Sequence, residues 1–479
     1  MAASYTKFIR DIQDSQDKIN SKGALGDCVP YYKHGAMPGD PSWTVAYPLL
    51  TYWMWKYYGD TRLASDHYDS IKLFLQFIEG ELDNKTGLLP NSVNHYGDWC
   101  AVIPSGLSGC ARKSGLISTF DWVKETQAFS EIANALGKTS DATYYNTLSN
   151  NAKKAIYNNY WDSSTGKFVD PINQAPTTTL QALGIDAEAI TDSSDITSAV
   201  ESIISYQEDN EKFHLGAGII GVKYIYPILC KYGHCDKALN VTLARTEPSY
   251  GYWYMQGATT LWENWESSQY HAAGSKNHIM FGAQSAWYYE YLGGIKQARN
   301  SINWENIIID PYINTTLYGI DDISASIGTY KGEINVHWMI PNTGICANVP
   351  ENSNAVLKCN SDTSKISKVI FASFGTPTGS CGKYETSNCN ANTSVSVVES
   401  MCIGKNDCTV PATDAVFGDP CYGTVKSLDI QVECDSDSGK PRLQIDVTIP
   451  SGSQGNVYLR RGVGNNVDIS QWIVTESNT

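Results

Sequence analysis

One carboxylate of this chain lies among tryptophans, in the segment Gly251-Tyr-Trp-Tyr-Met-Gln-Gly-Ala-Thr-Thr-Leu-Trp-Glu-Asn-Trp265, where it is Glu263. Tryptophan faces offer a flat apolar surface on which the C–H face of a sugar ring can rest. A carboxylate at the rim of such a surface can activate a water molecule or accept hydrogen bonds from hydroxyl groups. The same residue types also form core aromatic clusters around a structural Glu, so residue type alone leaves both interpretations open.

The composition limits the classes of partner. The chain has 479 residues, enough for two or three domains, and its 50 acidic residues outnumber its 35 basic residues. This net charge of −15 argues against nucleic acids and anionic membranes as partners. No segment approaches the roughly 20 consecutive apolar residues of a membrane span. The sequence indicates no cofactor and no metal ligands, and leaves calcium at a surface loop open.

Eight of the 13 cysteines lie between Cys346 and Cys434. Such clustering predicts a disulfide framework and an oxidising compartment, whereas zinc would need short Cys-x-x-Cys pairs, which do not occur. Secretion also agrees with four N-glycosylation sequons, at Asn84, Asn240, Asn314 and Asn392. Because the first residues form no apolar signal segment, we expect a secreted glycoprotein whose true start precedes Met1.

Helices are the elements that must position Glu263. Residues 1–297 alternate apolar or amphipathic segments with loops rich in Gly, Pro and Asn, without a fixed repeat period. The expected helices cover residues 42–58, 66–78, 119–136, 141–160, 193–206, 218–232 and 283–292. Long aromatic loops, which usually carry function, are expected at 23–41, 88–115 and 246–277. Antiparallel helices with such loops gathered at one end are typical of a helical barrel.

After Gly294 the hydrophobic pattern changes to period two, which predicts strands. The expected strands are 302–310, 325–330, 332–340, 442–449 and 455–460. The third and fourth of these flank the Cys-rich block and are expected to be neighbours in one β-sandwich. The block, residues 344–436, would then be a domain inserted into a loop, with 341–344 and 435–439 as hinges.

Six motifs follow one another along the chain. They are Asp40-Pro-Ser-Trp43, Tyr57-Tyr-Gly-Asp60, Tyr96-Gly-Asp-Trp99, Tyr250-Gly-Tyr252, Gly257-Ala-Thr-Thr-Leu-Trp-Glu-Asn-Trp265 and Asn277-His-Ile-Met-Phe-Gly282. Their order and spacing resemble the α-L-rhamnosidases of glycoside hydrolase family 78, over residues 5–343 and again 440–460. The resemblance implies an (α/α)6 six-hairpin barrel over 1–297, incomplete at its N-terminus, and a C-terminal β-sandwich made of 298–343 and 437–479.

The resemblance also implies an inverting hydrolase, which removes terminal α-L-rhamnosyl groups from glycosides or polysaccharides. One carboxyl group protonates the leaving oxygen while another activates water on the opposite face of the ring. The general base of the family's Thr-Thr-x-Trp-Glu-x-Trp motif falls on Glu263, and the sugar-contacting histidine of its Asn-His-x-x-Phe-Gly motif falls on His278. Without the resemblance, a lone histidine such as His278 would more often be a core residue.

Further substrate contacts are expected around these two residues. The barrel-mouth tryptophans of the family fall on Trp43 and Trp99, and Trp253 lies in the same stretch as Glu263. Asp98, beside Trp99, either binds sugar hydroxyls or caps a turn.

One departure from the family pattern concerns the general acid. The family carries it in an Asp-x-x-x-Arg-x-Glu-x-x-x-Trp-x-x-Asp motif that precedes the helix matching residues 2–16, so this chain is expected to begin after that motif. A non-catalytic carbohydrate-binding protein therefore stays open beside the hydrolase. Another (α/α)6 enzyme, such as a glucosidase or a lyase, is disfavoured by the Thr-Thr-Leu-Trp-Glu-Asn-Trp segment.

Residues 370–381 and 417–429 of the Cys-rich block are similar to the galactose/rhamnose-binding lectin domain of the SUEL type. All eight cysteines align, and the family's pairing implies the bridges Cys346–Cys381, Cys359–Cys434, Cys389–Cys421 and Cys402–Cys408; the sequence alone does not fix them. Outside the block, Cys100 and Cys110, and likewise Cys230 and Cys235, are close enough in sequence to bridge, which leaves Cys28.

The expected lectin-site residues are Asp419, Lys426 and Asp429, from the Asp-Pro-Cys and Lys-x-Leu-Asp elements. A galactose- or rhamnose-containing glycan would be the ligand. Because Ala347 stands where animal members have Glu, a disulfide-stabilised spacer without ligand also stays open.

Overall fold

The computed structural model describes residues 2–19, 23–29, 35–102, 108–109, 113–170, 177–265, 274–313, 320, 322–339, 344–359, 362–379, 381–382, 384–435 and 443–458. The chain divides into two compact units. The first comprises Met1–Ile313, Ala325–Val336 and Val447–Arg460, and the second comprises Asn314–Ser324, His337–Asp446 and Arg461–Thr479.

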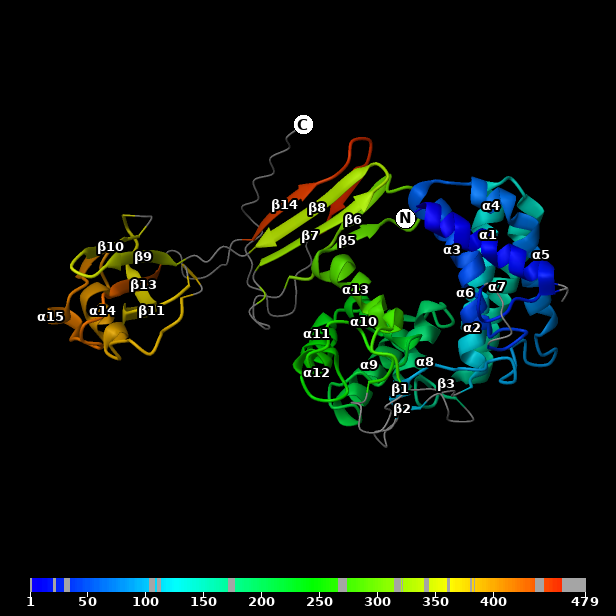
Figure 1. The fold of residues 1–479 in the computed structure, drawn as a ribbon, viewed down its shortest axis with the longest axis horizontal. Helices are drawn as coiled ribbons and strands as arrows, with labels where there is room; N and C mark the ends of the chain where they lie inside the picture. Colours follow the sequence, from blue (N-terminus) through cyan, green and yellow to red (C-terminus); the bar gives the residue numbers. More distant parts are fainter. Residues whose placement is uncertain are drawn as a thin grey trace. The chain divides into compact units, whose positions relative to one another are not determined.

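Helices make up most of the first unit. Their bounds are α1 Ala2–Ile19, α2 Pro41–Thr44, α3 Ala46–Tyr58, α4 Arg62–Asp66, α5 Tyr68–Gly80, α6 Gly115–Ala135, α7 Thr139–Tyr160, α8 Thr177–Asp186, α9 Ser193–Asp209, α10 Gly221–Lys231, α11 Cys235–Leu243, α12 Tyr250–Met255, η1 Ile279–Ala283, α13 Gln284–Trp287 and the π-helix η2 Tyr288–Leu292. They follow one another round a curve (Figure 1) and pack as successive pairs α6/α7, α8/α9 and α10/α11. An inner row, α3, α6, α8, α10 and α13, connects the pairs, because each of its members packs against the next.

The predicted helices are present, with shifted ends, and four α-helices were missed: α4, α8, α11 and α12, the last within the loop expected at 246–277. The segment expected as one helix over 42–58 is two, because Asp40 caps the short α2 and α3 begins after Val45. As expected, Gly59 ends α3: it adopts φ 69° and donates its N–H to the Trp55 carbonyl. Sequence reasoning overlooked α8, which opens on three threonines of modest helix propensity, and the short α11.

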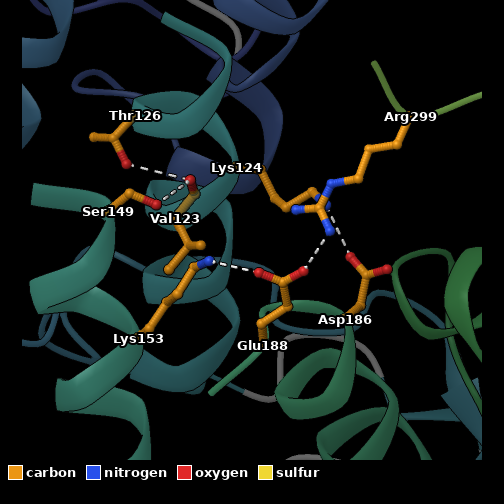
Figure 2. A network of polar contacts seen from close by, with 8 residues as sticks. All are labelled: Val123, Lys124, Thr126, Ser149, Lys153, Asp186, Glu188 and Arg299. Atoms are coloured by element: carbon orange, nitrogen blue, oxygen red, sulfur yellow. Dashed lines mark hydrogen bonds and ion pairs between the residues drawn. The ribbon is translucent and has the colours of Figure 1, made fainter. Parts of the chain in front are cut away.

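Two ion-pair groups tie the helices of the first unit together (Figure 2). Lys124 of α6 contacts Asp186 at the end of α8 at 2.9 Å. The Glu188 carboxylate forms one ion pair with Lys153 of α7 and another with Arg299, which follows strand β5. The nitrogen-to-oxygen distance is 2.9 Å in each pair. Because these side chains are partly exposed, each pair contributes about 1 kcal/mol or less, so their main effect is to fix which elements meet.

Strands follow the helices. Their bounds in the first part of the chain are β1 Ala101–Val102, β2 Ser108–Gly109, β3 Trp161–Asp162, β4 Lys167–Phe168, β5 Ile295–Gln297, β6 Asn306–Ile309, β7 Asp322–Thr329 and β8 Gly332–Met339; β14 Gln444–Thr448 and β15 Gln454–Val457 come after the Cys-rich block. One sheet has the order β14-β8-β7 and another β15-β6-β5. The expected pairing of the strands that flank the block is thus confirmed in β8 and β14. Most of both expected hinges lies outside the described residues.

The Cys-rich block folds around its own core, within the second unit. Its elements are β9 Ile345–Pro350, β10 Asn354–Lys358, β11 Ile366–Gly375, α14 Ser394–Cys402, β12 Asp407–Pro411, α15 Asp414–Phe417 and β13 Ser427–Cys434. An antiparallel sheet has the order β11-β13-β9, and β10 pairs with β12. All four bridges that the resemblance implies are present: Cys346–Cys381, Cys359–Cys434, Cys389–Cys421 and Cys402–Cys408.

Loss of the Cys359–Cys434 bridge, through alanine at both positions, is expected to lower the free energy of unfolding of this domain by about 2–5 kcal/mol. This bridge closes a separation of 75 residues, whereas Cys402–Cys408 closes only 6, so its loss frees more conformations of the unfolded chain. Urea unfolding, monitored by hydrogen exchange in β11 and β13, measures the loss of stability for this variant and for the corresponding variant with alanine at Cys402 and Cys408. A larger loss for the short bridge would contradict this reasoning.

The remaining cysteines agree in part with expectation. Cys230 and Cys235 form a bridge that joins the end of α10 to the start of α11. Cys110 lies outside the described residues, so the proposed Cys100–Cys110 pair is not tested, and Cys28 has no disulfide partner in the part of the chain that the structure describes.

None of the described helices is both long enough and apolar enough to cross a membrane.

Candidate active site

Backbone pairing holds the segment that carries Glu263. Ser249 caps α12 by accepting the N–H of Tyr252 at 2.9 Å, and the chain continues without regular structure after Gly257, whose φ is 78°. The Glu263 N–H then bonds to the Ser275 carbonyl at 2.9 Å. The His278 N–H bonds to the Leu261 carbonyl at 2.8 Å, so residues 261–263 and 275–278 lie side by side.

This pairing brings together the two residues predicted as base and sugar contact. The Glu263 Oε2 accepts the N–H of Ser275 at 2.8 Å and lies 3.9 Å from His278 Nδ1. The Glu263 side chain is 26% exposed and that of His278 is 40% exposed. A carboxylate held by one backbone N–H and open to solvent can accept a proton from water, and the adjacent imidazole can contact a hydroxyl group.

Two tryptophans near Glu263, Trp253 and Trp265, form a buried, stacked pair. Trp253 and Trp265 stack with ring centroids 4.4 Å apart, and the Trp253 Nε1–H bonds to the Trp265 carbonyl at 3.2 Å. Trp253 is 2% exposed and Trp265 is fully buried. This placement contradicts the predicted sugar contact of Trp253, because its ring faces and its N–H are used inside the protein. The core-cluster interpretation therefore holds for these two rings.

Trp43 and Trp99 are half-buried, and both pack against Tyr96. Trp43 lies on α2 and Trp99 precedes β1. The Cys100 thiol lies 3.4 Å from Asn264 Oδ1, which brings the Trp99 loop next to the residue that follows Glu263. We call Trp43, Trp99, Glu263 and His278 the candidate site.

Asp98 is placed differently from the sugar contact that was considered for it. Its carboxylate is fully buried and accepts the Thr179 hydroxyl at 2.6 Å and the N–H groups of Gly218, Ile220 and Gly221 at 2.8, 2.8 and 3.1 Å. Burial raises the pKa of this carboxyl against the effect of those hydrogen bonds. The capping alternative is the correct one, because Asp98 closes the start of α10 and leaves no oxygen exposed for a sugar.

Alanine at Asp98 is expected to lower the free energy of unfolding by about 3–5 kcal/mol, because four buried donors would lose their acceptor. Urea denaturation measures the loss. Asp162→Ala is the matched control, since Asp162 also accepts several hydrogen bonds but does so at the end of β3, from residues of an exposed turn. A destabilisation no larger than that of the control would contradict the structural role.

Sequence reasoning missed two carboxyl groups inside the helical unit. Asp121 and Glu125 lie one turn apart on α6 and are 5% and 0% exposed. Among the residues that the structure describes, Asp121 Oδ2 and both carboxylate oxygens of Glu125 have no hydrogen-bond partner. Burial raises the pKa of Asp121 to about 7 and that of Glu125 well above its ordinary value. The signal in the sequence was the spacing of these two acids, four residues apart beside the apolar residues Phe120, Trp122 and Val123.

The predicted lectin-site residues differ in exposure. The Lys426 side chain is 4% exposed, and its Nζ lies 3.3, 3.4 and 3.1 Å from carboxylate oxygens of Glu351, Asp414 and Asp419. Burial alone would lower the pKa of Lys426, but these hydrogen bonds, led by that of Asp419, raise it above its ordinary value. A sugar hydroxyl would have to displace one of the three carboxylates, because an ammonium group has three donors.

Asp429 is 2% exposed and accepts the Asn348 Nδ2–H at 2.5 Å, which contradicts its predicted contact with a glycan. Asp419 is 30% exposed, so its role at a lectin site stays a prediction.

Comparison with known families decides what the helical unit is. Residues 1–292 match the family model of the bacterial α-L-rhamnosidase six-hairpin glycosidase domain. The chain belongs to this family. Residues 357–434 match the D-galactoside/L-rhamnose binding SUEL lectin domain. Both matches agree with the resemblances found in the sequence.

Individual relatives of the six-hairpin family are longer than this chain. An α-L-rhamnosidase of Streptomyces avermitilis is 26% identical over 358 residues, which cover 73% of this chain and 32% of that protein. The structure of α-L-rhamnosidase from Dictyoglumus thermophilum matches with a TM-score of 0.63 and 24% identity, over 90% of this chain and 43% of that one. This likeness confirms the expected fold class. The chain spans about a third of the length of the curated α-L-rhamnosidases it matches.

The Cys-rich block has relatives of its own. β-Galactosidase 8 of Arabidopsis thaliana is 46% identical over 78 residues, which cover 16% of this chain and 9% of that protein. The shared part is therefore a single small domain within a larger protein.

Proposed function

We propose that the helical unit hydrolyses terminal α-L-rhamnosyl groups of glycosides or polysaccharides, with inversion at the anomeric carbon. The observation that carries the proposal is the Glu263 carboxylate, which is partly exposed to solvent, held by the Ser275 N–H and 3.9 Å from His278 Nδ1. The names of the matched relatives support rhamnose as the sugar. The half-buried Trp43 and Trp99 would bound the space in which it binds.

In this mechanism Glu263 accepts a proton from a water molecule, and the water oxygen bonds to the anomeric carbon. The bond from that carbon to the leaving oxygen breaks on the opposite face, and the leaving oxygen takes up a proton from a group other than Glu263. The Ser275 N–H keeps the carboxylate oriented through the hydrogen bond to Oε2. His278 would contact a sugar hydroxyl, so that the ring is held while the carbon inverts.

The test is release of L-rhamnose from an aryl α-L-rhamnoside by the full chain. Release from the rhamnoside without release from an aryl β-D-galactoside is the expected result. No release, or equal release from both substrates, would contradict the proposal.

A second function, carbohydrate binding without hydrolysis, is favoured by the lectin-domain match and by the surface beside Asp419. Tyr422 is 97% exposed and Val425 is 83% exposed, in the loop between Asp419 and Lys426. A glycan array probed with the full chain tests this function. Binding to galactose- or rhamnose-terminated glycans that survives Glu263→Gln and is lost in Asp419→Ala would assign it to the lectin domain; binding lost in Glu263→Gln alone would assign it to the candidate site.

We also propose that the protein works outside the cell. Five disulfide bridges occur among the described residues, and such bridges persist in oxidising compartments. Detection of the protein in the secreted fraction, with its bridges formed, is the expected result; detection in the cytosol alone would contradict it.

A further inference from the structure

The two tryptophans of the candidate site share one neighbour, Tyr96. Its ring centroid is 4.5 Å from that of Trp43, with the planes tilted by 42°, and 5.6 Å from that of Trp99, with the planes nearly perpendicular at 89°. Any rotation of the Tyr96 ring would therefore disturb its contacts with both tryptophans. The position of this ring is what relates Trp43 on α2 to Trp99 in a different loop.

Two carboxylates hold Tyr96 at its two ends. Its hydroxyl donates to Asp27 Oδ2 at 2.6 Å, and its backbone N–H donates to Asp40 Oδ2 at 3.0 Å. Burial and the Asp27 carboxylate raise the pKa of Tyr96 to about 12, so the hydroxyl remains a donor across the ordinary pH range. A hydrogen bond from a hydroxyl to a carboxylate is among the stronger kinds in proteins, which suits an anchor.

The two carboxylates are themselves connected. Asp27 Oδ1 accepts the N–H of Asp40 at 2.7 Å, and Asp40 Oδ1 accepts the N–H of Ser42 at 2.8 Å, which starts the helix that carries Trp43. The chain wraps closely round Asp27, because a Cβ at Gly39 would lie 2.9 Å from Asp27 N and Oδ1. Asp27 and Asp40 thus connect three segments of the chain, which carry Asp27, Asp40 and Tyr96.

We propose that Tyr96 and Asp27 are positioning residues, which set the separation and tilt of Trp43 and Trp99 for the apolar face of the sugar. The proposal rests on the proposed function, since it takes these rings to contact rhamnose. Neither Tyr96 nor Asp27 needs to touch the substrate. Their effect is on how well the two aromatic surfaces match the ring that lies against them.

Tyr96→Phe tests the anchor, because it removes the hydroxyl and keeps the ring. We expect the dissociation constant for L-rhamnose and the KM for an aryl rhamnoside to rise about 5- to 10-fold, with kcat within about twofold. Tyr52→Phe is the matched control: Tyr52 also donates its hydroxyl to a carboxylate, that of Glu131 at 2.9 Å, and is likewise partly buried. The control should leave both constants unchanged.

Asp27→Asn is the conservative variant: its amide oxygen can still accept the Tyr96 hydroxyl, and it gives up only the acceptor for the Asp40 N–H, whereas Asp27→Ala removes both acceptors. It should keep affinity closer to the wild type than Asp27→Ala does. Equal losses in these two variants, or equal affinities in the Tyr96 and Tyr52 variants, would overturn the positioning role.

A second measurement keeps the proposal testable if the chain binds no rhamnose, an outcome that would remove the proposed function instead. The protein is labelled with 5-fluorotryptophan, and the resonances of Trp43 and Trp99 are assigned from Trp43→Phe and Trp99→Phe. Without any sugar, Tyr96→Phe should shift or broaden both resonances, and Tyr52→Phe should leave them in place. Unchanged resonances in the Tyr96 variant would overturn the inference.

Discussion

Replacement of Glu263 by glutamine is expected to lower kcat for an aryl α-L-rhamnoside by about 10²–10⁴-fold, the usual contribution of a general base. An amide has nearly the same shape, but it cannot accept a proton from water. The amide oxygen can still receive the Ser275 N–H, so the segment should keep its conformation. Affinity for L-rhamnose should therefore stay within a few-fold of the wild type.

Steady-state kinetics and calorimetric titration with L-rhamnose measure the two effects separately. Glu201→Gln is a suitable control, because Glu201 is an exposed glutamate on α9. It should match the wild type in both assays. A wild-type rate in the Glu263 variant would remove this residue from the mechanism, whereas a loss of binding without a loss of kcat would make it a substrate contact.

The second large effect concerns pH. Asp121 titrates near 3.8 in an unfolded chain, and burial raises its folded-state pKa to about 7. A raised pKa means that the folded state holds this proton more tightly, so the stabilisation is fully present below about pH 4 and is lost as the pH rises through about 7. The difference corresponds to about 4 kcal/mol, and Glu125, whose pKa is also raised by burial, acts in the same direction. The free energy of unfolding should therefore fall between pH 5 and pH 8.

Urea denaturation at the two pH values, on wild type and Asp121→Asn, measures this effect. The variant should lose less stability than the wild type when the pH is raised, because an amide does not ionise. Asp83→Asn is the control of opposite sign. Hydrogen bonds from Thr86 and Lys85 lower the pKa of Asp83, so this variant should change the pH dependence of the free energy of unfolding at acidic pH instead. Equal pH dependence of wild type and Asp121→Asn would contradict the assignment.

Much of the fold could be predicted from the sequence, because the spacing of apolar residues and the glycines that end helices are local features of the chain. The helix that became α7 was expected at 141–160 and spans Thr139–Tyr160, and Gly59 ends α3 as its type suggests. In contrast, α8 begins with threonines, which have low helix propensity, and is formed because its buried face packs on α6, α9 and α10. Such tertiary support leaves little local signal.

Only some of the site residues were predicted correctly, because several of their contacts join residues that are far apart in the sequence. Glu263 and His278 are 15 residues apart in sequence, and it is the pairing of their backbones that brings the side chains together. The partners of Asp98 are 81 and 120 residues away at Thr179 and Gly218, so its structural role had no local signal. Trp253 lies on a six-residue helix, too short for hydrophobic periodicity to show which face is buried.

The most direct test of the account is the configuration of the first sugar released from an aryl α-L-rhamnoside, followed by proton NMR before mutarotation. If Glu263 directs water to the face opposite the leaving oxygen, β-L-rhamnose should appear first, and its signal should be lost in Glu263→Gln. Initial release of α-L-rhamnose, or β-L-rhamnose formed at an unchanged rate by the variant, would contradict the account.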